Sequence, residues 1–311
     1  MAKKSACVSC SSISFSPLFS CNDKNMNIPG EYHYHRCTRC GLIILDPRPS
    51  VKQLLQHYPQ ETYYAYSTID TDSIETKIRQ ILYRVFFDVS YKNILIKLLL
   101  KPFKFLSRST LIAKKSRLLD VGCGAGQFVY EMKKLGADAQ GVEPYCDANT
   151  KKKPGITIFH GELIKAKFRP GYFDVITMNH VLEHIQKPKQ TLQEIFRILK
   201  PNGRFIVAVP NAASLAYGLF GKNWYQIDTP RHIFLYTTKI LRSMLVSSGF
   251  TIKKIRFNSG PRQFSHSLLH FFNIRWMYKC IGILDILFLP LVHVVNFFHI
   301  GDQFEIICTK E

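Results

Sequence analysis

The sequence predicts an α/β fold in which an open β-sheet carries helices on both faces. Two short apolar runs, 117–121 and a second that ends at Glu143, flank a glycine-rich turn and an amphipathic stretch. This order is typical of a strand, a turn, a helix and a second strand. Residues 173–179 and 204–209 read as further buried strands. The alternation of strands with segments of helical spacing indicates the fold class.

The glycine turn predicts a site for an adenosine-type cofactor. Gly122, Gly124 and Gly126 let the backbone turn sharply and approach a ligand more closely than any Cβ would allow. The free N–H groups of the helix that follows favour an anionic group. Glu143, at the tip of the next strand, is placed to accept hydrogen bonds from ribose hydroxyls. The alternative is a tight turn in an unrelated α/β protein.

The spacing Asp120-x-Gly122-x-Gly124-x-Gly126 resembles motif I of the class I S-adenosylmethionine (SAM) methyltransferases. The segment 181–184 (V-L-E-H) and the turn 199–203 resemble two further motifs of that family, in the same order, and the match spans 116–250. The resemblance implies a seven-stranded Rossmann-like sheet whose last strand is antiparallel. It also implies that SAM is the cofactor and that the residues around it are Asp120, Gly122, Gly124, Gly126, Glu143, Glu162, Leu163 and Asn179, with Glu162 and Leu163 against the adenine.

Further along the chain the pattern stays regular. Thr237 or Thr238 is expected to cap a helix that Gly249 ends. The remaining expected elements are a third strand at 156–159, helices at 190–200 and 237–248, and the last two strands at 251–257 and 303–309.

Two histidines are candidates for the chemistry. Methyl transfer to a hydroxyl needs an aligned nucleophile and a base that removes its proton. In the ubiquinone-type O-methyltransferases that this region resembles, the V-L-E-H segment borders the methyl acceptor, so His184 is the first candidate and His232 the second. An ordinary imidazole pKa near 6.5 suits this role. The alternative is that His184 caps a helix or packs structurally.

The substrate pocket should lie outside the carboxyl ends of the strands. A tyrosine cluster at 63–66 and the loop 210–232 are expected to cover it, with Tyr64, Trp224 and Arg231 near the substrate. The tyrosines would serve equally well as a packing patch.

Four of the nine cysteines form two knuckles, Cys7-x-x-Cys10 and Cys37-x-x-Cys40. This spacing predicts a structural zinc ion, for which Cys21, His33 or His35 could replace one ligand. The segment resembles the zinc-ribbon-like head of some sugar and natural-product methyltransferases. We therefore expect a head at 1–46 with its own core, a helical connector and cap at 47–115, and a SAM-dependent methyltransferase core at 116–311.

The connector and one insertion are unusually apolar. A helix is predicted over 73–106, with Ile74, Ile78, Ile81, Leu82 and Val85 on one face, and Pro102 ending or kinking it. Within the insertion 260–300, Pro290 and Asp285 argue against a membrane-spanning helix and favour an interfacial hairpin. Lysines at 92, 97, 101 and 104 would meet anionic lipid. The alternative is that the two stretches pack together as a lid.

These observations predict a SAM-dependent methyltransferase acting at oxygen on a small-molecule, sugar or lipid-linked acceptor. The net charge of +20 indicates an anionic partner, which is nucleic acid, a membrane surface or a phosphate-bearing substrate. An RNA methyltransferase is less favoured, because no Asn-Pro-Pro-Tyr follows the fourth strand. A catalytically idle SAM-binding or membrane-adaptor protein is the other alternative. No apolar segment follows Met1 to Lys4, so we expect a cytoplasmic protein, peripheral on the inner face of a membrane.

Overall fold

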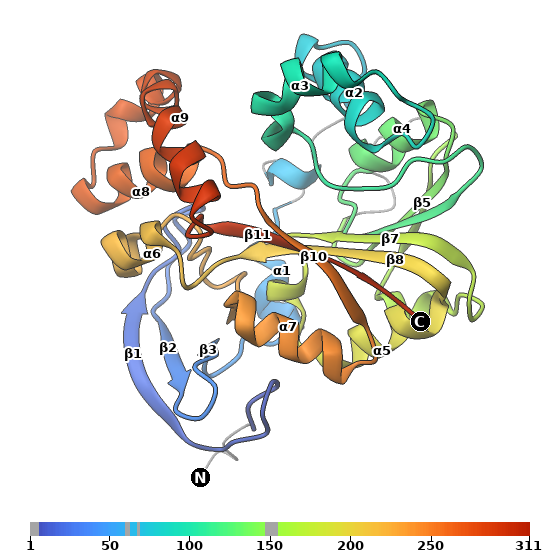
Figure 1. The fold of residues 1–311 in the computed structure, drawn as a ribbon. Helices are drawn as coiled ribbons and strands as arrows, with labels where there is room; N and C mark the ends of the chain where they lie inside the picture. The colour runs from blue at the N-terminus through green and yellow to red at the C-terminus, as the bar shows by residue number, and fades with distance from the viewer. Residues whose placement is uncertain (1–5, 60–62, 67–68, 147–154) are drawn as a thin grey trace.

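The computed structural model describes residues 6–59, 63–66, 69–146 and 155–311, apart from the side chains of Tyr64, Phe105 and Arg275. Its larger sheet has seven strands in the order β10-β11-β8-β7-β4-β5-β6 (Figure 1). Strands β4 to β8 pair in parallel, and β11 is antiparallel to both of its neighbours, as predicted. The strands are β4 (Arg117–Val121), β5 (Asp138–Glu143), β6 (Thr157–His160), β7 (Phe173–Asn179), β8 (Leu199–Pro210), β10 (Thr251–Phe257) and β11 (Gln303–Thr309).

Helices cover both faces of this sheet, which confirms the predicted fold class. Successive strand residues point to opposite faces, so Leu118 packs with Phe128 of one helical layer, whereas Leu119 packs in the cluster that contains Leu192 of the other. The first layer holds α2 (Ile74–Phe87) and α4 (Gln127–Lys134), and the second holds α5 (Pro188–Ile198) and α7 (Thr238–Ser247).

The caps of α7 are those that the sequence predicts. The Thr237 side chain accepts a hydrogen bond from the backbone N–H of Ile240, which satisfies one free donor of the first turn. Gly249 follows the helix with a φ of +94°, a conformation that glycine adopts at little cost.

The single helix predicted over 73–106 is wrong. The chain forms α2, an extended break at Asp88 that bridges Ile112, then α3 (Ile94–Leu100) and a 3-10 turn (Lys101–Leu106). Asn93 caps α3 by accepting a hydrogen bond from the N–H of Ile96 at 3.1 Å. A local polar cap and a tertiary bridge therefore outweigh the continuous apolar pattern.

The predicted face of the first helix is also partly wrong. Leu82 and Val85 are buried as expected, but Ile74, Ile78 and Ile81 are exposed. Tyr83 and Phe87 take the buried positions instead, because their rings pack in the cluster with Phe128. Large aromatic side chains bury more area than isoleucine and decide which face meets the sheet.

The N-terminal segment builds a second, four-stranded sheet in the order β1-β2-β3-β9. Its strands are β1 (Phe15–Cys21), β2 (Tyr32–Cys37), β3 (Ile43–Leu45) and β9 (Phe234–Leu235). Because β9 comes from residue 234 onward, the large domain completes the sheet of the head. One hydrophobic cluster contains Cys37 and Ile44 together with Leu182 and Tyr236. The expectation that the head has a separate core is therefore wrong.

The insertion before β11 is helical, as predicted. It contains α8 (Arg262–Phe272), a 3-10 turn and α9 (Ile281–Phe297), and α6 (Leu215–Phe220) lies in the loop after β8. Pro290 lies inside α9 without ending it. Among the described residues, the stretch Trp276–Phe297 is long and apolar enough to cross a membrane by length and composition alone. Of its most apolar 18 residues, 11% are buried.

Candidate functional site

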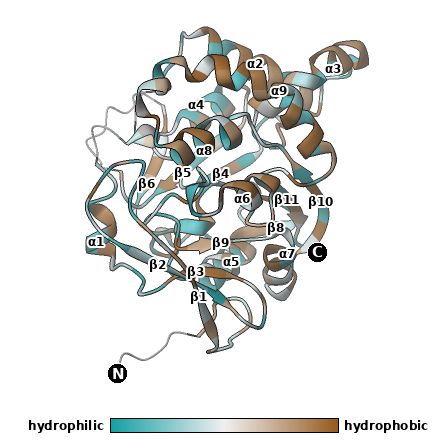
Figure 2. Ribbon diagram, turned by 90° about the vertical axis from the view of Figure 1, so that its left-hand side faces the viewer, coloured by the Kyte–Doolittle hydropathy of each residue, from teal (hydrophilic) through white to brown (hydrophobic). Residues whose placement is uncertain are grey.

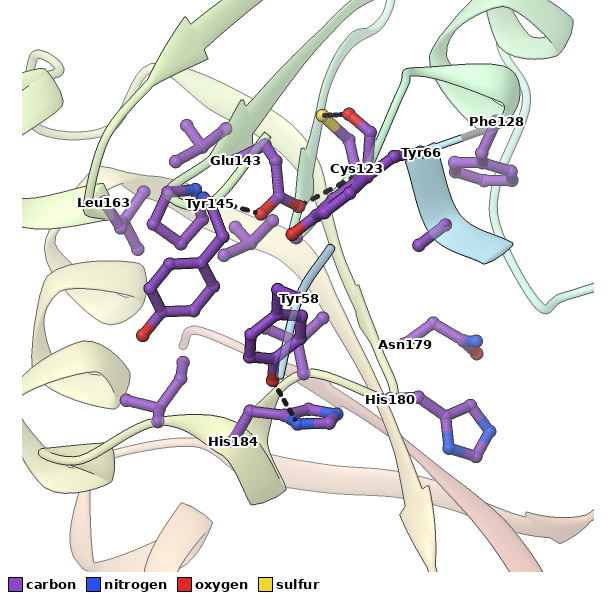
Figure 3. A pocket seen from close by; sticks show the side chains of 18 of the residues that line it. Tyr58, Tyr66, Cys123, Phe128, Glu143, Tyr145, Leu163, Asn179, His180 and His184 are labelled. Atoms are coloured by element: carbon purple, nitrogen blue, oxygen red, sulfur yellow. Dashed lines mark hydrogen bonds between the residues drawn. The ribbon is translucent and has the colours of Figure 1, made fainter. Parts of the chain in front are cut away.

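A cavity of about 1330 Å³ opens at the carboxyl ends of β4, β5 and β7. Its wall combines the turn after β4, the acid that ends β5, the segment after β7 and the connector around α1 (Val51–Leu55). Figure 3 shows Glu143, Tyr145 and Leu163 together on one side and Asn179, His180 and His184 on the other. The cavity therefore has room for a nucleoside and for a second molecule beside it.

The glycine turn has a left-handed backbone conformation, in which a residue with a side chain would be strained. The φ angles of Gly122 and Gly124 are +73° and +56°. A Cβ on Gly122 would lie 2.2 Å from Val181 Cγ2, and a Cβ on Gly124 would lie 2.3 Å from the carbonyl oxygen of Ala65. The glycines therefore also make room for protein neighbours, because the 3-10 turn Tyr64–Tyr66 packs directly on the loop.

Two buried carboxylates meet this turn. Glu143 Oε2 accepts the N–H of Gly124 at 2.9 Å and its Oε1 accepts the N–H of Tyr145 at 3.1 Å. Asp120 Oδ1 accepts the Thr177 hydroxyl at 2.7 Å, whereas Oδ2 has no hydrogen-bond partner among the described residues. Burial raises the pKa of both acids. A carboxylate oxygen accepts more than one hydrogen bond, so both acids keep capacity for ribose hydroxyls or an ammonium group.

The two residues expected at the adenine lie in the cavity wall but differ in exposure. Leu163 is buried. The Glu162 side chain is mostly exposed, with its Oε2 3.9 Å from Lys165 Nζ. Tyr145, which stacks on Tyr58 with ring centroids 5.0 Å apart, adds an aromatic surface that we did not predict. The position of Tyr145, two residues after Glu143, could have identified it from the sequence. No motif marks Tyr58, which lies in the connector.

His184 lies in the cavity wall with one nitrogen fixed. Its Nδ1 is 2.9 Å from the carbonyl oxygen of Arg231, which can only accept, so Nδ1 carries the hydrogen and Nε2 carries the lone pair. The Tyr58 hydroxyl also lies 2.9 Å from Nδ1 (Figure 3). Burial, aided by the neighbouring His232, lowers the pKa of His184 to about 4. The imidazole is therefore neutral at pH 7 and able to accept a proton.

In the part of the chain that the structure describes, His232 does not line the cavity. Its Nδ1 donates to the carbonyl of Gln226 at 2.7 Å, and its ring packs edge-on against His184 with centroids 4.6 Å apart. The geometry therefore gives His232 a supporting place behind His184.

Trp224 and Arg231, expected near the substrate, are 1% exposed and do not belong to the described cavity wall. The Arg231 guanidinium is held by Asp23, at 3.0 Å on two atoms, and by Asp228, at 2.8 and 2.5 Å. Although burial opposes it, this pairing lowers the pKa of Asp228 far below its usual range. The expected substrate contact of Arg231 is thus replaced by a structural one. The side chain of Tyr64 lies outside the described residues.

The two residues at the carboxyl end of β7 were anticipated only in part, because Asn179, expected at SAM, is the last residue of β7, whereas His180, which follows it, was not expected. Asn179 and His180 line the cavity, and His180 has a φ of +55°. His180 Nδ1 lies 3.3 Å from Glu183 Oε1, and Glu183 is fully buried with no hydrogen bond to either oxygen among the described residues. Glu183, His184 and His232 bring donor atoms within 4.8 Å of one another and could hold a metal ion.

The four knuckle cysteines converge as the sequence predicts. Cys7 and Cys40 have their sulfurs 3.6 Å apart, as do Cys10 and Cys37, and all four sulfurs lie within 4.8 Å. Tetrahedral zinc with bonds of about 2.3 Å places thiolates about 3.8 Å apart, so the set fits this ion.

Two of the suggested substitute ligands have other partners. Cys21 contacts the Thr229 hydroxyl at 3.0 Å, and His33 contacts the Ser20 hydroxyl at 2.7 Å.

Comparison with known proteins gives a consistent picture. A family model described as a methyltransferase domain matches residues 91–255, just over half of the 311 residues. The ubiquinone biosynthesis O-methyltransferase of Maricaulis maris is 32% identical over 169 residues, covering 48% of this chain and 65% of its own. The mitochondrial enzyme of that name from Schizosaccharomyces pombe is 31% identical over 121 residues, covering 36% and 43%.

A solved SAM-dependent methyltransferase from Archaeoglobus fulgidus is 19% identical, with a TM-score of 0.45, and the match covers 74% of this chain and 99% of that one. The chain spans less than two thirds of the length of the two ubiquinone biosynthesis relatives.

Two substitutions test the cofactor half of the cavity. Gly122→Val places a side chain on Val181 at a strained φ, and Glu143→Gln removes the charge that we expect to face the ribose. We expect each to weaken SAM binding by about 1–3 kcal/mol, measured by calorimetry. Gly218→Ala is the matched control, because its Cβ meets nothing within 4 Å. Unchanged SAM affinity in both variants would contradict the assignment.

Proposed function

Because the chain belongs to the methyltransferase-domain family, we propose that it transfers a methyl group from SAM to an oxygen of a small-molecule, sugar or lipid-linked acceptor. The observation that carries this proposal is the neutral His184, which lines one cavity with the glycine turn and Glu143 and whose Nε2 carries the lone pair. The printed names of the relatives, which are O-methyltransferases, support oxygen as the methylated atom.

The cofactor would be held by residues that fit it chemically. Bound SAM supplies a methyl group on a positively charged sulfur. Glu143 offers its carboxylate to the ribose hydroxyls, and Asp120 offers Oδ2, which lies 3.8 Å from Arg108 Nη1 and accepts no hydrogen bond from the described residues, toward a cationic or water-bridged group. Leu163 and Tyr145 supply apolar and aromatic surface for the adenine.

The residues of the chain then handle the proton. His184 Nε2 takes the hydroxyl proton of the acceptor while the Arg231 carbonyl keeps the hydrogen on Nδ1. Tyr58 stays protonated, because burial raises its pKa well above its usual value, and its hydroxyl holds the same imidazole edge. Tyr58, Tyr63 and Tyr66 are buried beside one another and exclude water from this side of the cavity.

His184→Gln tests the base. We expect kcat to fall by about 10²–10⁴-fold while SAM affinity stays unchanged, because the side chain touches the acceptor side only. Formation of S-adenosylhomocysteine with an extract of small molecules and lipids is the readout, and His33→Gln, an exposed head histidine, is the control.

The pH dependence of the wild-type protein provides a second check. The base must be neutral, and its pKa is lowered to about 4. Therefore kcat should stay level from pH 8 to about pH 5 and decline only below this range. An acid limb at pH 6.5 or higher, or a His184→Gln variant with full activity, would contradict the role.

We also propose that the four knuckle cysteines bind one structural zinc ion. The sulfur spacing supports this, and protein atoms fill all four positions, as in structural sites. Cys37 and Cys7 belong to the hydrophobic cluster that contains Tyr58 and Leu182. Loss of the metal should therefore disturb the whole protein, beyond the head alone.

Cys37→Ala tests the zinc proposal. We expect the purified variant to lose at least about half of its zinc, and to melt at least about 5 °C lower in a single transition, because the core is shared. Cys280→Ala, which changes an exposed cysteine, should match the wild type in both. Full zinc content in Cys37→Ala, or a head that melts separately, would argue against the proposal.

We further propose that the protein binds an anionic membrane surface with α3 and α9. Both helices carry large exposed apolar side chains, and both lie at the end of the molecule opposite the N-terminal sheet in each of two views (Figures 1 and 2). The transfer of such side chains from water into the interfacial layer of a bilayer is favourable. On α3 and α9 they are Ile94, Leu95, Leu98, Leu99, Ile283, Ile286, Leu287, Val294 and Phe297.

Charge and location support the same partner. Lys92 and Lys101 are exposed beside α3, and the net charge is +20. Lys104 does not contribute, because it packs over Phe86 and Phe87 and burial lowers its pKa to about 8. Leu106, next to α3, also lines the cavity, so an acceptor with an apolar tail would have a route from lipid to the site.

The polar groups of α9 favour an interfacial position over a spanning one. Asp285 accepts the Ser265 hydroxyl at 2.5 Å, and Asn296 bonds both the N–H and the carbonyl of Ser259 at 3.0 Å. These contacts hold α9 against the body of the protein.

Flotation with liposomes tests the membrane proposal. We expect binding that requires anionic lipid, weakens in high salt, and falls with Leu95→Asp plus Leu99→Asp or with Phe297→Asp plus Phe298→Asp. Val246→Asp is the control, because Val246 is an exposed apolar residue on α7, away from both helices. A protein that stays unbound with every lipid mixture, or that forms a dimer through these helices, would refute the proposal.

A further inference from the structure

A buried ionic cluster connects the N-terminal sheet to the histidine of the cavity. Asp23 follows β1, is 2% exposed, and forms a two-point pair with the guanidinium of Arg231, 208 residues away, at 3.0 Å for each contact. Asp228 pairs the other edge of the same guanidinium. A buried guanidinium is tolerated only when its donors are satisfied, so this pairing fixes Arg231 firmly.

Arg231 contacts His184 through its backbone. The carbonyl oxygen of Arg231 is the acceptor for His184 Nδ1 at 2.9 Å. Because Asp23 holds the side chain of Arg231 on the side of the head, it also limits where that carbonyl can lie.

A second branch reaches the same nitrogen. Asp23 Oδ2 accepts His57 Nδ1–H at 2.9 Å, and the carbonyl of His57 accepts from Arg231 at 3.2 Å. The next residue, Tyr58, places its hydroxyl 2.9 Å from His184 Nδ1. The Tyr32 hydroxyl lies 3.0 Å from His57 Nε2 and completes the partners of that ring.

From these contacts we propose that Asp23 is a positioning residue for His184, which it orients through Arg231 and through His57 and Tyr58. The proposal rests on the proposed function, in which His184 accepts the acceptor's proton. Both groups at Nδ1 depend on one carboxylate from the head. With the Arg231 carbonyl in place the hydrogen stays on Nδ1, whereas a displaced carbonyl allows the hydrogen to move to Nε2, where the imidazole could not accept the proton.

This inference gives the head a role in the chemistry. The segment that follows the head strand β1 supplies Asp23, and the Tyr34 hydroxyl on β2 donates to the carbonyl of His232 at 2.8 Å. Two residues of the head thus hold the 231–232 backbone that contacts or supports His184. The head is therefore part of the site's framework.

Asp23→Asn is the test, because it keeps the shape and removes the charge. We expect kcat to fall by about 10- to 100-fold, with SAM affinity within about twofold of wild type, because Asp23 is not among the residues that line the cavity. Asp23→Glu should restore part of the loss. Glu31→Gln, an exposed carboxylate in the same head, is the matched control.

A readout independent of activity separates this inference from the proposed function. ¹⁵N NMR of protein that contains ¹⁵N-labelled histidine reports which ring nitrogen carries the hydrogen. The His184 signal is assigned by its loss in His184→Gln. We expect the Nδ1–H form in the wild type and a mixture of both forms in Asp23→Asn. If the mixture appears but His184→Gln keeps full kcat, positioning stands and the base role fails.

An unchanged His184 spectrum in a folded Asp23→Asn would overturn the inference, whatever happens to activity. If Asp23→Asn does not fold, His57→Gln tests the branch through Tyr58 while the pair of Asp23 with Arg231 remains. The same spectral change, of smaller size, would support the inference, and its absence would refute it.

Discussion

The buried guanidinium of Arg231 is the constraint on which the arrangement of this protein depends. Taking a charge out of water is costly unless carboxylates surround it, and here one carboxylate comes from the N-terminal head and the other from the loop after β8. The head, the connector and the loop must therefore be in place together. The shared hydrophobic cluster and the pairing of β3 with β9 follow from the same arrangement. The cysteine knuckles thus share one hydrophobic cluster with Tyr58 and Leu163 of the cavity wall.

Features that depend on neighbours in the sequence could be predicted from it. The antiparallel last strand of the large sheet, the glycine turn, Glu143 at the tip of β5 and the meeting of the four cysteines all follow from short-range spacing or from a family motif. The bounds of β7, β10 and β11 were predicted to the residue, because Gly or Pro turn residues lie close to the start of each strand. Of these features, the glycine turn, Glu143 and the end of β7 line the cavity.

Features decided by distant contacts could not be predicted. The helix over 73–106 is interrupted because Asp88 bridges Ile112, which lies beyond the apparent helix. Arg231 was expected at the substrate because its loop was expected to cover the pocket, yet its partner Asp23 is 208 positions away. Tyr58 carries no motif and reaches His184 only through the fold. Sequence patterns identify such residues as polar or aromatic but do not name their partners.

The two halves of the cavity together support the proposal that this protein moves a methyl group from SAM to an acceptor oxygen beside His184. The most direct measurement incubates the purified protein with SAM that carries an isotope-labelled methyl group and with a cell extract containing small molecules and lipids, followed by mass spectrometry. The account predicts a labelled methyl ether or ester that forms with the wild type and is nearly absent with His184→Gln. Label found only on carbon, nitrogen or RNA, or no labelled product although SAM binds, would contradict it.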